Sequence, residues 1–270
     1  MGQGIAQICA TSGYSVLLYD VDAGFIKKGI SNIEASLQIS VDKNKLPSDQ
    51  KQESLNRIKS CQNLDQVKAD LIIEAAIEKL DVKREIFKAL ENSNSTDSIL
   101  ATNTSSIPVT QIAAVLKQPN RFAGLHFFNP AHIMKLVEVI SGVSTSAETT
   151  EQLRIFSKSL GKTPISVKDS PGFVVNRVAR HYYVEALKVL EENVSDVKTI
   201  DSLLRSSGFK MGAFELMDLI GVDTNFAVTT SMYNAFHQDP KFRPSRIQQQ
   251  KVEAGHHGQK SGKGFYDYTK

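Results

Sequence analysis

The chain has 270 residues, of which 41% are hydrophobic and 23% are charged, and its formal net charge is +3. This length suits two domains of the usual size, and the composition allows each to bury a core. The small net charge, the lack of long runs of like charge and the absence of tryptophan argue against nucleic acid or a membrane surface as a partner. We therefore expect neither.

The cysteine pattern and the hydropathy pattern bear on the compartment. Cys9 and Cys61 are far apart and fit neither a metal-ligand nor a redox spacing, so no disulfide scaffold is expected. No apolar run reaches the length of a membrane span, and residues 1–20 lack the basic and apolar regions of a secretory signal. We expect a cytoplasmic protein.

The first half of the chain alternates strand-like and helix-like segments, which is typical of a parallel sheet covered by helices. A helix is predicted over residues 1–13, closing at Gly13, and residues 14–20 form a short apolar strand that ends in an acid. The polar stretch 22–60 is expected to be helical, with a break near residues 46–48. Further strands are predicted at 69–76 and 98–103, and helices at 80–91 and 108–116.

The pattern changes after residue 120. Residues 121–128 and 135–140 are predicted to be two strands joined by a proline-containing turn, followed by a helix near 147–160 and a strand near 162–168. Strand signals then fade, and residues 173–192 carry apolar positions at helical spacing. We place a boundary at residue 169 between an α/β domain, residues 1–169, and an α-helical domain, residues 170–270.

A glycine-containing segment opens the first helix. Gly2 and Gly4 stand at its start, and the strand that follows ends in Asp20. In dinucleotide-binding βαβ units, glycines let the backbone approach the pyrophosphate at a helix N-terminus, and an acid about twenty residues further on binds the ribose hydroxyls. Asp20 would repel a 2′-phosphate, so the pattern favours NAD over NADP.

Part of this dinucleotide fingerprint is missing. Its first two glycines and the strand that should precede them are absent before Met1. Such a strand is normally central, and its loss leaves neighbouring backbone groups unpaired. We expect the natural protein to begin roughly ten residues earlier, which is enough for one strand and its turn.

Polar residues at the ends of predicted strands suit the oxidation of a secondary alcohol. Histidine as a residue type suits acid and base duty at neutral pH, so His126 could accept the hydroxyl proton as hydride leaves carbon. Glu138 stands in an otherwise apolar strand, where a carboxylate could fix the histidine tautomer and stabilise the imidazolium. Ser105 and Asn176 could orient the substrate oxygens. Taken singly, each residue also fits a structural role, such as a core histidine, a solvent-facing glutamate, a helix cap or a linker turn.

Taken together, these segments resemble the 3-hydroxyacyl-CoA dehydrogenase family over essentially the full chain. The matching segments are LYD at 18–20, IEAAIEKLDVKREIF at 73–87, ATNTSSIP at 101–108, RFAGLHFFNPAHIMKLVEVI at 121–140, DSPGFVVNR at 169–177, MGAFELMDLIGVD at 211–223 and SGKGFYDY at 261–268. The resemblance implies an NAD-dependent oxidoreductase of the 3-hydroxybutyryl-CoA dehydrogenase type. It also implies a Rossmann-type domain joined to a helical domain, with the active site in the cleft between them and a homodimer formed through the second domain.

The resemblance also assigns roles to residues. His126 would be the acid or base and Glu138 its partner, while Ser105 and Asn176 would contact the substrate oxygen. The residues expected at the NAD site are Gly2, Asp20, Glu78, Lys83 and Asn103.

Two further residues fall where the family contacts the CoA moiety of its substrate. Ser36 and Lys43 are seven residues apart, and so on one face of the predicted helix, and a lysine there can pair with a CoA phosphate. A solvated lysine on a polar helix is the alternative, and Lys27, Lys28 or Lys45 could serve instead.

Other readings stay open. A related β-hydroxyacid dehydrogenase acting on a free acid would need a cationic clamp and no CoA contacts. A non-catalytic relative would be expected to lose His126 or Glu138, and both are present. The ending just after GFYDY disfavours a fragment of a multifunctional fatty-acid oxidation protein.

Two local departures complete the comparison with the family. Ala213 stands where the family has proline, which should loosen a turn. His256 and His257 lack accompanying acids or cysteines, so no metal is expected.

Overall fold

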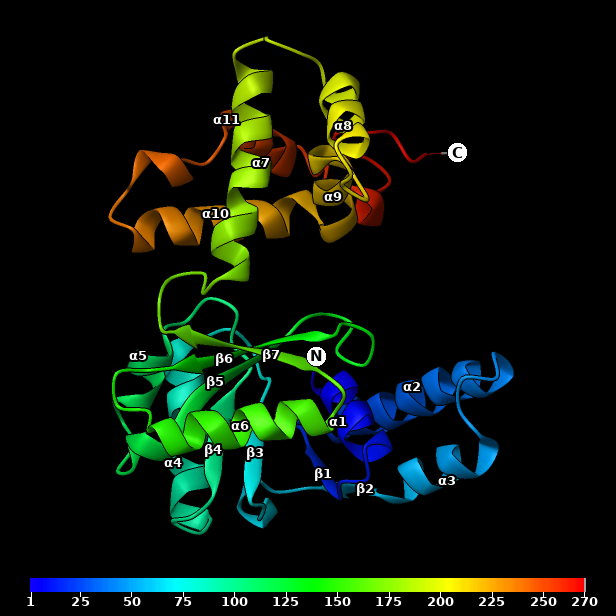
Figure 1. Cartoon of the computed structure of the whole chain (residues 1–270), viewed down its shortest axis with the longest axis vertical. Coiled ribbons are helices and arrows are strands. Elements are labelled where there is room, and N and C mark those ends of the chain that lie inside the picture. Colours follow the sequence, from blue (N-terminus) through cyan, green and yellow to red (C-terminus); the bar gives the residue numbers. More distant parts are fainter. Residues whose placement is uncertain (270) are drawn as a thin grey trace. The chain divides into compact units, whose positions relative to one another are not determined.

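The computed structural model describes residues 1–269 and divides into two compact units, residues 1–170 and the residues from Pro171 onward (Figure 1). The first unit is an α/β layer structure and the second is helical. Among residues 1–269, no helix is both long and apolar enough to cross a membrane.

The first unit alternates helices and strands, as the sequence predicts. Its elements are α1 (Gly2–Thr11), β1 (Val16–Tyr19), α2 (Ala23–Asp42), α3 (Ser48–Asn56), β2 (Ile58–Cys61), β3 (Leu71–Glu74), α4 (Leu80–Ser93), β4 (Ile99–Thr102), α5 (Val109–Ala113), β5 (Phe122–Phe127), β6 (Leu136–Ser141), α6 (Ala147–Ser159) and β7 (Thr163–Lys168). The fold class predicted for this part, a Rossmann-type α/β arrangement, is confirmed.

One local prediction is wrong. Residues 58–61 were expected to end the second helix of the 22–60 stretch, but they form β2, which pairs in parallel with β1 from Val16↔Ile58 to Tyr19↔Cys61. Ile58 and Cys61 are the apolar residues of this four-residue segment, too few to show a strand period. Pairing with a strand about forty residues away therefore overrides the helical signal.

The remaining strands form one sheet in the order β3-β4-β5-β6-β7. All neighbours are parallel except β5 and β6, which pair antiparallel. Every residue of β4 and β5 is buried, so these strands form the middle of the core. Gly124 on β5 allows this packing, because a Cβ there would lie 2.9 Å from both Ile140 and Val109.

The sheet is interrupted between β1 and β3. No strand joins the β1-β2 pair to the other five within the described residues. Val16, Leu71 and Ile73 border the interruption and are only partly buried, although they pack on the same cluster as Ile5 of α1. The apolar residues on either side of this interruption are less covered than those of the central strands.

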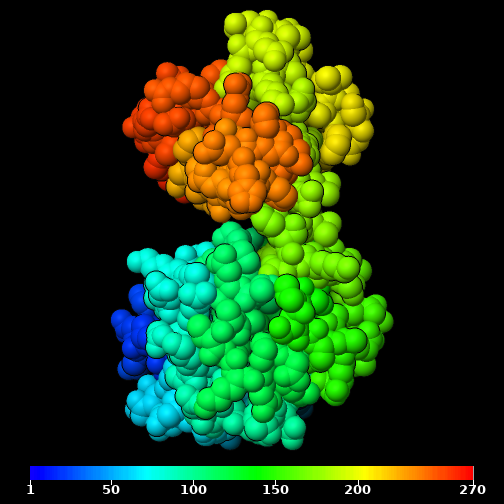
Figure 2. Space-filling view, turned by 90° about the vertical axis from the view of Figure 1, so that its left-hand side faces the viewer, coloured from blue at the N-terminus to red at the C-terminus, as the bar shows by residue number. Residues whose placement is uncertain are grey.

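The second unit is built from helices. They are α7 (Val175–Glu191), α8 (Val197–Ser206), α9 (Ala213–Ile220), α10 (Val222–Ala235) and α11 (Arg246–Glu253), with 3-10 turns at Pro240–Phe242 and Gln259–Ser261. Leu187, Phe214 and Met217 lie in its core. In Figure 2, the orange atoms near residue 240 lie on the surface of this unit.

Two buried carboxylates hold the end of this unit together. Asp218 accepts hydrogen bonds from the backbone N–H groups of Phe265 and Tyr266, each at 2.9 Å. Asp201 accepts from the Tyr266 hydroxyl at 2.8 Å and from the N–H of Phe214 at 3.0 Å. The segment around Ala213 is therefore anchored by Asp201 with alanine in place of the family's proline.

Candidate active site

The site begins with two residues that face each other across β5 and β6. His126 and Glu138 are paired in the antiparallel register, and such cross-strand side chains share one face of the sheet. The His126 Nδ1 lies 2.8 Å from the Glu138 Oε2. His126 is 6% exposed and Glu138 is fully buried. The structure thus places the two predicted partners in hydrogen-bond contact, with Nδ1 facing the carboxylate.

The loop after β4 is held by a carboxylate from the segment after β3. The Glu78 Oε1 accepts hydrogen bonds from the backbone N–H groups of Ser105 and Ser106 at 3.0 and 3.1 Å and from the Thr104 hydroxyl at 2.5 Å. Burial raises the pKa of Glu78, but the hydrogen bonds and the nearby Lys83 ammonium outweigh it and hold that pKa below its ordinary value. Glu78 therefore stays ionised and fixes the backbone at Ser105.

Asn103 ties this loop to the histidine strand. Its Oδ1 accepts a hydrogen bond from the N–H of Phe127 at 2.8 Å, next to His126. The sequence places Asn103 at the NAD site, and the structure shows that it also joins the carboxyl ends of β4 and β5. Ser105, just after β4, and His126, near the end of β5, are thereby tied to two strands that are linked directly.

Lys83 is one of the most deeply buried side chains of the unit, at 1% exposed. Its Nζ lies 2.6 Å from Glu74 and 3.3 Å from Glu78. Glu74 also accepts a hydrogen bond from the Thr102 hydroxyl at 2.7 Å. Sequence reasoning found Lys83 and Glu78 but missed Glu74. The available signal was an acid ending the apolar run Leu71–Glu74, which repeats the pattern of the strand that ends before Asp20.

The N-terminus of α1 suits a dinucleotide. Gly2 is the first helical residue, and a Cβ there would meet Ala75 at 3.9 Å, just past the end of β3. Met1 precedes the helix and forms no side-chain cap, so first-turn N–H groups remain to bind an anion. Asp20 follows β1 and is exposed, as an acid that binds ribose hydroxyls must be. These residues fit NAD.

The two predicted CoA contacts lie at the far end of α2. Ser36 is inside the helix, and its Oγ accepts a hydrogen bond from Gln7 at 3.0 Å. Lys43 is exposed and lies one residue beyond the helix, not on its face as the sequence predicts, because α2 ends at Asp42. Its N–H still bonds to Ile39, so it continues the helical path.

Ser36 borders a polar hollow of about 110 Å³ with Gln7, Asn32 and His132. The His132 Nδ1 is buried without a hydrogen-bond partner among residues 1–269, and burial followed by the Lys162 charge lowers the pKa of this imidazole. Sequence reasoning missed His132, which stands in a turn with no periodic signal.

Asn176 lies in the second unit, in the first turn of α7, and is half-buried. His126, Glu138, Ser105 and Asn103 are assembled within the first unit, whereas Asn176 belongs to the second.

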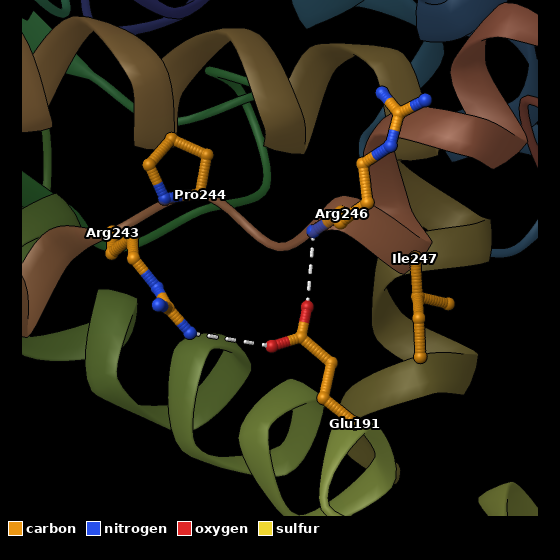
Figure 3. Close-up of a pocket in the computed structure, with 5 residues that line it drawn as sticks. All are labelled: Glu191, Arg243, Pro244, Arg246 and Ile247. Carbon is orange, nitrogen blue, oxygen red and sulfur yellow. Dashed lines mark hydrogen bonds and ion pairs between the residues drawn. The ribbon is translucent and has the colours of Figure 1, made fainter.

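A hollow of about 360 Å³ lies elsewhere in the helical unit (Figure 3). Glu191 lies between Arg243, 3.7 Å away, and the N–H of Arg246, 3.0 Å away. The Glu191 carboxylate is thus already paired with Arg243, and the Arg246 guanidinium is paired with Glu253. We therefore do not assign the reaction to this hollow.

The fold and the site define a class of protein. A Rossmann-type unit with a dinucleotide-compatible helix start and a buried histidine–glutamate pair is the arrangement of an NAD-binding oxidoreductase. Residues 1–170 match the family model of the 3-hydroxyacyl-CoA dehydrogenase NAD binding domain, and residues 172–268 match that of the C-terminal domain. The chain belongs to the 3-hydroxyacyl-CoA dehydrogenase family.

Individual relatives agree with this assignment. The chain is 49% identical over 270 residues to an Escherichia coli 3-hydroxyadipyl-CoA dehydrogenase, covering 99% of this chain but only 57% of that protein. It is 39% identical to a probable 3-hydroxybutyryl-CoA dehydrogenase of Bacillus subtilis, covering 99% and 94% of the two chains. The crystal structure of (S)-3-hydroxybutyryl-CoA dehydrogenase from Ralstonia eutropha is similar with a TM-score of 0.97 at 42% identity, covering 100% and 96%.

Proposed function

We propose that the protein interconverts an L-3-hydroxyacyl-CoA and the corresponding 3-ketoacyl-CoA. The observation that carries this proposal is the buried hydrogen bond of 2.8 Å between the His126 Nδ1 and Glu138. This arrangement assigns proton exchange with the substrate to Nε2, because Nδ1 faces the carboxylate. Because the chain spans little more than half of its Escherichia coli relative, the reaction is a proposal for this chain.

In the oxidative direction His126 accepts the proton of the 3-hydroxyl group, and in the reductive direction it returns that proton to the 3-keto oxygen. Glu138 stabilises the imidazolium that forms and keeps the ring in one orientation. Bound NAD supplies the acceptor for the hydride that leaves C3. Ser105 and Asn176 are proposed to hydrogen-bond the reacting oxygen.

NAD would be held along the edge of the first unit where the carboxyl ends of β1, β3 and β4 lie. The N-terminus of α1 at Gly2 would bind the pyrophosphate, and Asp20 the adenine ribose. Glu78, Lys83 and Asn103 would line the nicotinamide side, where the Glu78 hydrogen bonds fix the loop after β4. Ser36 and Lys43 would bind the CoA moiety of the substrate.

The setting of the enzyme is also proposed. We infer a cytoplasmic homodimer that works in fatty-acid β-oxidation or a similar acyl-CoA pathway, with association through the helical unit. The relatives differ in the acyl chain that their names state, 3-hydroxyadipyl or 3-hydroxybutyryl. Two acyl classes therefore remain for this chain, one ending in a carboxylate and one ending in a methyl group.

The test is the reduction of acetoacetyl-CoA, followed by the loss of NADH absorbance. Folded protein is expected to be active with acetoacetyl-CoA and inactive with free acetoacetate. Activity on the free acid alone would favour the β-hydroxyacid reading. If the protein folds and binds NAD but reduces neither acetoacetyl-CoA nor acetoacetate, the result would favour a non-catalytic relative.

The same assay on a chain extended before Met1 by an apolar strand and a glycine turn tests the interruption of the sheet. The added strand is expected to raise both the affinity for NAD and the melting temperature, because the unpaired edges of β1 and β3 would gain a partner. An extension of equal length made of serine and glycine is the control. Equal melting temperatures for the two extensions would contradict the expectation.

A further inference from the structure

Arg180 is a buried cation in the second unit. Its side chain lies inside the helical unit at 3% exposed. Its Nη1 donates to the Asn225 backbone oxygen and to the Asn225 Oδ1, each at 3.2 Å, and to the Thr229 hydroxyl at 3.0 Å. All of these acceptors are uncharged. The helix α7 thus carries a positive charge into its contact with α10, where the hydrogen bonds hold one end of the guanidinium in place.

The other arginines show how unusual this is. Seven of them lie within 4.0 Å of a carboxylate, and all seven are exposed or half-buried, as Figure 3 shows for Arg243 beside Glu191. Arg180 is more deeply buried than any of the seven, yet no carboxylate among residues 1–269 lies within that distance of it. Buried charges are normally paired, because removing an ion from water is costly. Burial lowers the pKa of Arg180 to about 10, and this effect outweighs the opposing contribution of Tyr183, whose ring centre lies 5.3 Å from the guanidinium carbon.

The unused part of the guanidinium has the shape that a carboxylate recognises. The Nε is buried and has no hydrogen-bond partner among residues 1–269, and the hydrogen bonds of the group run through Nη1. Nε and Nη2 form one planar edge with parallel N–H groups, which can bind the two oxygens of a carboxylate. Because Asn225 and Thr229 already orient the opposite side, this edge is fixed before a ligand arrives.

Arg180 lies on the same helix, α7, as Asn176, which we propose to bind the reacting oxygen of the substrate. Arg180 follows Asn176 by four residues, so the two side chains share one face of the helix at a rise of about 6 Å. Three or four carbon–carbon bonds of about 1.5 Å each span a comparable length.

We propose that Arg180 binds a carboxylate at the far end of the acyl chain, which makes the preferred substrate the CoA thioester of a short dicarboxylic 3-hydroxy acid. This inference rests on the function proposed above, and it selects between the two acyl classes left open there. A methyl-terminated acyl chain would leave the Arg180 guanidinium buried without a counter-charge, whereas a terminal carboxylate would supply that counter-charge.

The test compares two six-carbon thioesters that differ only at the far end of the chain, 3-hydroxyadipyl-CoA and 3-hydroxyhexanoyl-CoA. The kcat/KM of the unaltered protein is expected to favour the dicarboxylic substrate by about 10- to 100-fold, as a charge-assisted hydrogen-bonded pair would produce. In Arg180→Leu and Arg180→Gln this ratio is expected to fall to near one, through KM for the dicarboxylic substrate. Arg246→Leu removes an exposed arginine of the same unit and should keep the ratio.

A ratio near one in the unaltered protein would overturn the proposal without requiring any variant to fold. Equal losses on both substrates in a folded Arg180→Gln would also overturn it, because a structural role does not distinguish the two chains. Calorimetric binding of adipyl-CoA and hexanoyl-CoA, which lack the reacting hydroxyl, separates this inference from the reaction. Selective binding of adipyl-CoA that depends on Arg180 would support the carboxylate site even in a protein that catalyses nothing, whereas equal binding would refute it.

Discussion

Two deeply buried cations, Lys83 in the first unit and Arg180 in the second, have different partners. In the first unit Lys83 lies between Glu74 and Glu78 and His126 lies against Glu138, whereas the buried Lys162 donates only to backbone oxygens. In the second unit Arg180 is equally buried and has only neutral partners. Complete networks hold the parts of a site in position. At Arg180 we propose that a ligand supplies the missing charge, and the Lys83 prediction below tests what a complete network contributes.

The largest effect is expected from His126→Ala. Turnover should fall by about 10²- to 10⁴-fold, because proton transfer loses its acid and base. The affinity for NAD should change little, since the work of this residue is done in the transition state. Stopped-flow turnover and NAD titration of the same preparation measure both. Near-normal turnover would show that another group carries the proton.

Lys83→Met tests whether the network of the first unit is complete. The change leaves Glu74 buried without a counter-charge, and breaking a buried pair in this way costs about 3–5 kcal/mol. The free energy of unfolding, measured with urea, should fall accordingly. The control is Lys88→Met on the same helix, whose Lys88–Glu85 pair is largely exposed and should contribute about 1 kcal/mol or less. Equal losses in the two variants would contradict the difference in burial.

Glu138→Gln tests whether the charge of the carboxylate beside His126 contributes to turnover. Glutamine keeps the size of the side chain and a hydrogen-bonding oxygen but removes the charge that stabilises the imidazolium. A fall in turnover of about 10- to 100-fold is expected, as for partners that orient a reacting histidine. Wild-type turnover in this variant would remove Glu138 from the mechanism.

The smallest effect is expected from Glu78→Gln, and it depends on pH. The folded-state pKa of Glu78 lies below its ordinary value, so its ionised form stabilises the fold at pH above the unfolded pKa of about 4.3. That contribution is lost as pH falls through the folded pKa. The difference in unfolding free energy between wild type and variant should therefore be present at pH 7 and vanish in acid. A difference that is independent of pH would indicate lost hydrogen bonds alone.

Much of the fold could be read from local patterns. The strands at 14–20, 69–76, 98–103, 121–128 and 135–140, the helix at 80–91 and the break near Pro47 all follow from hydropathy period and turn residues. β2 was missed because four residues are too few to show a period, and its partner lies elsewhere in the chain. Lys43 was placed on the helix because the helix end at Asp42 carries no strong stop signal.

Some residues of the candidate site could be predicted from the sequence and others could not. His126 and Glu138 could be paired from sequence because they stand on consecutive strands, where an antiparallel turn places them opposite each other. Glu74 and His132 could not be identified from the sequence. Glu74 matters because it pairs with Lys83, and His132 because it lines the polar hollow beside Ser36, and both contacts form only in the folded chain. A single acid in an apolar run looks the same whether it meets a lysine or water.

By itself the sequence determined the alternation of strands and helices, the dinucleotide features at the first helix, and the histidine–glutamate pair, because each depends on residues close together in the chain or on adjacent elements. Only the tertiary structure decided that the sheet is interrupted beside β3, that Lys83 is enclosed by two glutamates, and that Arg180 meets Asn225, 45 residues away, instead of an acid. These features arise from packing between distant segments. Burial and charge compensation are properties of the assembled neighbourhood, which no short stretch of sequence specifies.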